Sequence, residues 1–94
     1  MEKEERKRLY VRAINIWGSD AQRNMVFEEL GELNTALSRY IRGRATKEEV
    51  ITELADVTIM CEQMAMMLDY DDYEKELDRK LVRLRDEKLA KYEY

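Results

Sequence analysis

Histidine is absent from this 94-residue chain, and its absence removes several classes of chemistry. A Ser-His-Asp or Cys-His nucleophile system, a histidine general base and a histidine-rich zinc site all need that side chain. Any chemistry therefore has to use carboxylates, lysine, arginine or tyrosine.

The chain also has no proline, three glycines and a single cysteine, Cys61. One cysteine excludes an intramolecular disulfide and is typical of a reducing compartment. Charged residues make up 40% of the chain and hydrophobic residues 45%, a balance that suits amphipathic helices better than strands.

Long apolar runs and a positive charge balance are missing as well. The most apolar stretch, 51–68, is interrupted by acidic residues, which argues against a membrane span. The net charge of -4 argues against an extended nucleic-acid site. The N-terminal sequence MEKEERKR has no apolar core of a secretory signal, so we expect a cytoplasmic protein.

Apolar periodicity and helix signals predict a single all-α domain over residues 1–94, a four-helix antiparallel bundle. Glycines after Trp17 and after Arg42 favour helix ends, and Ser19 with Gln22 and Thr46 with Glu49 resemble capping boxes. The polar cluster 69–72 provides a further cap. The predicted helices are 4–16, a second that follows the Ser19 cap and ends at 42, 47–68 and 72–91.

The third predicted helix, 47–68, is apolar nearly all round. Val50, Leu54 and Val57 lie on one side, whereas Ile51, Ala55 and Ile59 lie on the other. A domain of this size can bury both sides only against another copy, so the pattern predicts a homo-oligomer, a dimer or a tetramer.

Two acidic i,i+3 pairs occur on the second and third predicted helices. Glu29 and Glu32 share a face, as do Glu53 and Asp56, and the two pairs lie at similar heights if the helices are antiparallel. The four carboxylates are therefore expected to converge.

Helical phase places Glu29 and Glu53 beside the apolar side of their helices. Clustered carboxylates near a core are costly unless a cation compensates them. Oxygen-only ligands select a hard cation, which predicts Mg²⁺, with Mn²⁺ as a possible substitute. The alternative is a set of solvated acids on ordinary helix surfaces, because the chain has 21 acidic residues.

A family resemblance extends this pattern. Glu29-x-x-Glu32, twenty intervening residues and Glu53-x-x-Asp56 resemble the signature of the all-α nucleoside triphosphate pyrophosphatases, which include the MazG-like nucleotide pyrophosphohydrolases. The similarity covers about residues 9–88. It includes Trp17-Gly18 and Gln22, the segments EELGEL and ELADVTIM, and Lys80-x-x-Arg83-Leu84.

The resemblance implies a helical bundle completed by oligomerisation and hydrolysis of a nucleoside triphosphate to the monophosphate and pyrophosphate. It implies that Glu29, Glu32, Glu53 and Asp56 ligate Mg²⁺ and that Glu32 orients or deprotonates the attacking water, with Glu28 in a supporting role. Removal of unwanted nucleotides from the cellular pool is the role expected of such an enzyme.

Four further residues are expected to bind the substrate. Lys80 and Arg83 are predicted to neutralise phosphate oxygens, although a solvated basic face would have the same spacing. Trp17 could stack on a base and Gln22 could hydrogen-bond one, although packing roles would explain both residues equally simply.

Three alternative functions remain open at this stage. The chain could be a non-enzymatic helical interaction module, a nucleotide-binding relative that has lost catalysis, or an enzyme similar to phosphoribosyl-ATP pyrophosphohydrolase. No motif in the sequence indicates the base or the sugar.

Overall fold

The computed structural model describes residues 1–92, and these residues confirm the all-α prediction. The helices are α1 (Lys3–Trp17), α2 (Ser19–Ile41), α3 (Lys47–Leu68) and α4 (Tyr70–Arg83), followed by a π-helical turn, Leu84–Lys88. No strand occurs in this part of the chain. Across residues 1–92, the helices do not include a candidate membrane span.

The turn between α1 and α2 is made by one glycine. Gly18 adopts φ 89°, a conformation that side chains disfavour, and its N–H donates to the carbonyl oxygen of Ile14 at 2.8 Å. Ser19 already lies inside α2, so the predicted capping box of Ser19 with Gln22 does not form.

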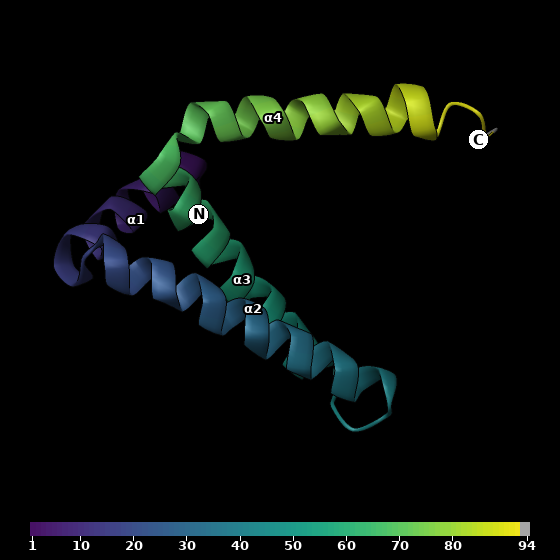
Figure 1. Ribbon diagram of the computed structural model, residues 1–94, viewed down its shortest axis with the longest axis horizontal. Coiled ribbons are helices and arrows are strands. Elements are labelled where there is room, and N and C mark those ends of the chain that lie inside the picture. Colours follow the sequence, from purple (N-terminus) through teal and green to yellow (C-terminus); the bar gives the residue numbers. More distant parts are fainter. Residues whose placement is uncertain (93–94) are drawn as a thin grey trace.

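The α2–α3 connection has the predicted signals. Gly43 has φ 73°. The capping box is complete, because the Glu49 N–H donates to Thr46 Oγ1 at 3.1 Å and the Thr46 N–H donates to Glu49 Oε2 at 3.2 Å. The two long helices consequently form an antiparallel hairpin (Figure 1).

Helix α1 packs against this hairpin near the end of α3. The buried apolar residues here are few: Tyr10, Met60 and Ala65. The buried acid Glu62 pairs with the Arg6 guanidinium and accepts a hydrogen bond from the Tyr10 hydroxyl at 3.2 Å. Helices α1, α2 and α3 therefore form one packed body with a small core.

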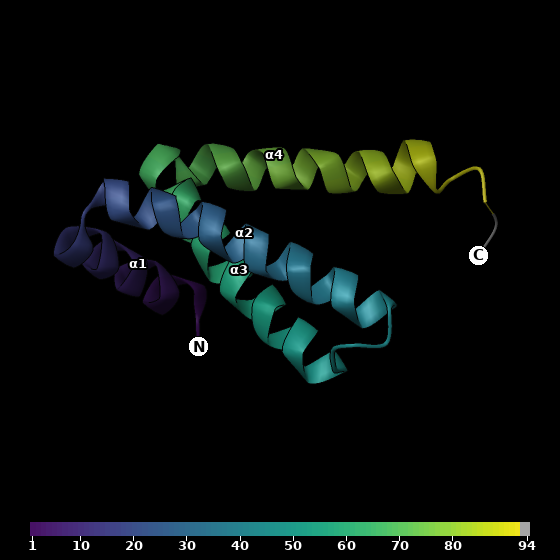
Figure 2. The same ribbon diagram turned by 60° about the horizontal axis from the view of Figure 1, so that its bottom comes forward.

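Helix α4 starts at Tyr70, two residues earlier than predicted, because the Asp69 side chain accepts from the Asp72 N–H at 3.1 Å. Regular helix ends at Arg83 rather than near residue 91. Helix α4 extends away from the other three helices in both views (Figures 1 and 2). The four helices therefore do not close a bundle within one chain.

Candidate metal centre

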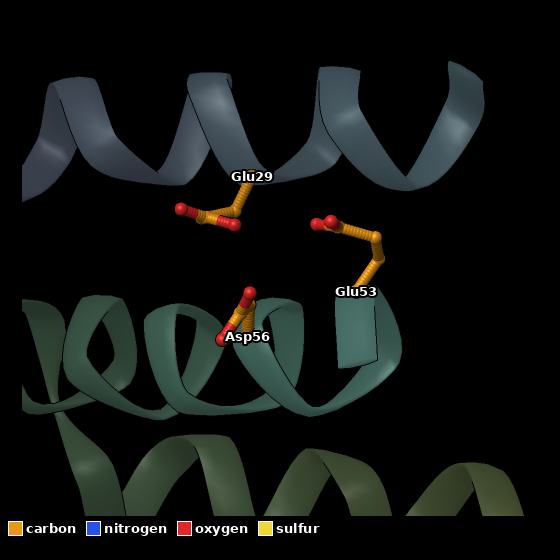
Figure 3. Close-up of side chains that lie close together, drawn as sticks. All are labelled: Glu29, Glu53 and Asp56. Atoms are coloured by element: carbon orange, nitrogen blue, oxygen red, sulfur yellow. The ribbon is translucent and has the colours of Figure 1, made fainter. Parts of the chain in front are cut away.

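Three of the four predicted acids meet between α2 and α3. Figure 3 shows Glu29 extending from α2 toward Glu53 and Asp56 on α3. One carboxylate oxygen from each lies within 4.8 Å of the others, and all three side chains are half-buried. The antiparallel hairpin thus brings together three of the four predicted acids, and Glu32 stays outside the group.

Two of these carboxylates have buried oxygens without a partner. Oε2 of Glu29 and Oε2 of Glu53 accept no hydrogen bond, and none of the ion pairs found in residues 1–92 involves the three acids. Glu62 shows that this chain can supply partners to a buried acid, because Arg6 and Tyr10 satisfy it. Within residues 1–92, no basic side chain or hydroxyl pairs with Glu29 or Glu53 in this way, and leaving their Oε2 atoms unsatisfied is costly.

Two carboxylates of this cluster, Glu29 and Glu53, have pKa values above the ordinary range. Burial raises the pKa of Glu29, and the negative charges of Glu32, Asp56 and Glu53 raise it further. Burial likewise raises the pKa of Glu53, with added contributions from Glu32 and Asp56. Every cause raises the pKa, so no basic group in residues 1–92 lowers the pKa of either carboxyl.

These shifts predict how stability depends on pH when no metal is bound. Between the ordinary value of 4.5 and the raised value, folded Glu29 binds more protons than unfolded Glu29. Its contribution to the free energy of unfolding is therefore present at low pH and lost as pH rises. Urea unfolding in EDTA, at about pH 5 and about pH 8, should show a smaller pH-dependent loss for Glu29→Gln than for wild type. Equal losses would contradict the cluster's electrostatics.

The donor set fits a hard divalent cation. Three carboxylates offer oxygen ligands only, and a cation would satisfy the two orphaned oxygens and offset the raised pKa values together. Mg²⁺ is usually bound through one or two carboxylates and leaves its other positions to water and substrate phosphates. The residues present are therefore suited to holding Mg²⁺.

Glu32 lies at the edge of the cluster. Its side chain is exposed and near enough to raise the pKa of both Glu29 and Glu53, but it is outside the group of three converging oxygens. It lines an open hollow of about 600 Å³ beside the cluster, together with Glu28, Arg39 and Glu53. Glu32 and Glu53 therefore both line the hollow, and Glu53 also belongs to the three converging acids.

Arg39 is a residue at this hollow that sequence reasoning missed. It lies seven residues after Glu32, which is two helical turns and nearly the same face of α2. Its guanidinium donates to the backbone oxygen of Arg44 at 2.9 Å. The i,i+7 spacing from Glu32 was the signal in the sequence that could have identified Arg39. The Arg39 guanidinium adds a positive charge to this otherwise acidic hollow.

The predicted substrate-binding residues do not lie in this hollow. Lys80 and Arg83 are exposed on α4, where they line a separate shallow hollow with Leu84 and Lys88. Trp17 is 65% exposed at the end of α1, and Gln22 is buried near the start of α2. A single chain therefore assembles the acids without these four residues.

A scan against protein-family models, a search of curated proteins and a search of solved structures each find no match.

Proposed function

We propose that this chain is a Mg²⁺-dependent nucleoside triphosphate pyrophosphohydrolase of the MazG-like type. The proposal rests mainly on two buried carboxylate oxygens, one from Glu29 and one from Glu53, that have no hydrogen-bond partner. The two side chains extend toward each other in the space between α2 and α3 (Figure 3). Buried carboxylate oxygens without a partner are costly to stability, so their presence in the folded chain favours a functional role. Their spacing is also the one on which the family resemblance rests.

A phosphate substrate follows from the charge of the site. A cluster of acids repels a triphosphate unless a bound cation lies between them, and Mg²⁺ is the usual bridge to phosphate oxygens. The adjoining hollow, about 600 Å³, is within the size range of small-molecule sites. Arg39 at its wall is placed to contact phosphate oxygens that the cation leaves free.

The proposed reaction is hydrolysis of the bond between the α- and β-phosphates. A water oxygen bonds to phosphorus, the bridging P–O bond breaks, and pyrophosphate leaves with that electron pair. When bound, Mg²⁺ would neutralise phosphate charge and acidify the water. Glu32, exposed beside the acids, would accept the proton of the attacking water.

The other predicted substrate contacts depend on assembly. Lys80 and Arg83 would reach a nucleotide at this hollow only from another copy of the chain, because α4 extends away from its own body (Figure 2). The bundle implied by the resemblance likewise needs more than one chain. Trp17, largely exposed, stays available for base stacking or for an interface.

Pyrophosphate release tests the function directly. The assay should include canonical ribo- and deoxyribonucleoside triphosphates and phosphoribosyl-ATP, each with Mg²⁺ and with EDTA. We expect at least one triphosphate to be cleaved with Mg²⁺ and none with EDTA, and the panel would rank base and sugar. Nucleotide binding without turnover would indicate that catalysis has been lost. No cleavage with Mg²⁺ or Mn²⁺, in a protein whose stability ignores both metals, would favour an interaction module.

A further inference from the structure

The solvent-exposed area of a single chain is too large for its mass. The chain exposes 7475 Å², whereas a folded monomer of 11.3 kDa is expected to expose about 5,700 Å². Its radius of gyration is 16.2 Å, against about 12 Å for a compact domain of this length. The excess of roughly 1,700 Å² is more than the ~800 Å² that each partner buries in a standard interface.

Helix α4 contributes to this exposed surface, because it has an apolar stripe and little of its own chain to cover it. Near its start, Glu74 pairs with Lys3 at 2.5 Å, and Tyr70 lies under the Lys7 ammonium at 4.6 Å. Beyond these contacts the helix leaves the body (Figure 1). The stripe lies within about 80° of one side at 100° per residue. It comprises Tyr73, Leu77, Leu81 and Leu84, whose exposed fractions range from 37% to 54%.

The charges of α4 and the turn after it are divided along the helix axis. Residues 70–78 include five acidic side chains and one basic one, whereas residues 79–88 include five basic side chains and two acidic ones. Two such helices side by side attract each other when antiparallel and repel when parallel.

The apolar stripe has the same antiparallel symmetry. If residue i of one helix faces residue 158 − i of another, Leu77 faces the partner's Leu81, and Tyr73 lies beside the partner's Leu84. This register is unchanged when the two chains are exchanged, which is the condition for an interface with two-fold symmetry. It also places the end of each stripe near the start of the other.

The start of α4 has a place to receive that end. A hollow of about 500 Å³ lies in the angle between α3 and α4, and we call it the crook. It is lined by Cys61, Met64, Ala65, Leu68 and Tyr73, with acids around them. Leu68 is 74% exposed, so the crook is apolar and uncovered in a single chain.

We propose that two copies of this chain pair through antiparallel α4 helices, and that the end of each α4 lies in the crook of the other copy. The pairing covers the apolar stripe of α4 and the free side of α3 around Cys61. It matches the acidic half of each α4 with the basic half of its partner. This pairing is argued without the acid cluster or the metal, so it can be tested without measuring hydrolysis.

Size-exclusion chromatography with light scattering tests the pairing on full-length protein. Wild type should be dimeric or an even-numbered multimer at micromolar concentration. Leu81→Glu should shift it at least tenfold toward monomer, while circular dichroism shows that α1–α3 stay helical. Val82→Glu is the matched control, because Val82 is on the other side of α4, and it should leave assembly unchanged. A monomeric wild type, or equal loss in both variants, would overturn the proposal.

Cysteine cross-linking tests the register and direction. In a Cys61→Ser background, a mixture of Leu77→Cys and Leu81→Cys chains should form an interchain disulfide under mild oxidation. Each variant alone should form much less, because residue 77 faces residue 81 in an antiparallel pair. Stronger cross-linking of Leu77→Cys with itself would indicate parallel helices and contradict the proposal. Neither experiment measures activity, so each stands or falls separately from the proposed function.

Discussion

Glu53→Gln is expected to lower kcat/KM for pyrophosphate release at least about 100-fold, because it removes one of three converging oxygen donors. The amide keeps the size of the side chain and its position on α3. It cannot carry the negative charge that holds a cation, and its NH₂ group would point a donor at Glu29 or Asp56. Steady-state rates with the best nucleotide of the panel would measure the effect.

Glu48→Gln is the matched control for this substitution. Glu48 is an exposed acid in the first turn of the same helix, and it lines neither the cluster nor the adjoining hollow. It should retain nearly the full rate. If Glu53→Gln and Glu48→Gln had the same activity as wild type, the three-acid cluster would have no part in catalysis.

Mg²⁺ is expected to stabilise the folded protein strongly. A ligand at 100 times its dissociation constant adds about 2.7 kcal/mol, and in a domain of this length that corresponds to a rise in Tm of roughly 10 °C or more. The gain has a structural source, because the cation would satisfy oxygens of Glu29 and Glu53 that have no partner. Thermal unfolding followed by circular dichroism, in EDTA and across a Mg²⁺ titration, measures it.

The double variant Glu29→Gln with Glu53→Gln separates a specific site from general salt effects. It should be more stable than wild type in EDTA, because two carboxyl groups with raised pKa values are gone. It should also gain almost nothing from Mg²⁺. A rise in Tm as large as that of wild type would place the stabilising ion elsewhere on this acidic protein.

The sequence predicted the helices and the convergence of acids because both depend on local rules. Helix ends followed from Gly18, Gly43 and the Thr46 capping box, and the face shared by Glu53 and Asp56 followed from helical spacing. Antiparallel packing of two helices joined by a short turn then brought Glu29 to them. Each step needed neighbours in sequence and one hairpin.

Long-range placement was beyond the reach of the sequence. The direction of α4 depends on the angle at Asp69, which no periodicity encodes, so the position of Lys80 relative to the acids was not predictable. The partners of Glu62 were missed for the same reason, because Arg6 comes from 56 positions earlier in the chain. The spacing of Arg39 from Glu32 could be seen in the sequence. Only the structure shows that both residues line the same hollow.

The hairpin of α2 and α3 implies where this site can tolerate a change in chain length. One residue added inside either helix, after Glu32 or before Glu53, would rotate one acid pair by about 100° relative to the other. The same residue added to the connection 42–46 would be absorbed outside the helices. The twenty residues that separate Glu32 from Glu53 therefore consist of two helical segments of fixed length and a connecting loop that can vary in length. A search for other chains with this site should fix the two helical lengths and let only the loop vary.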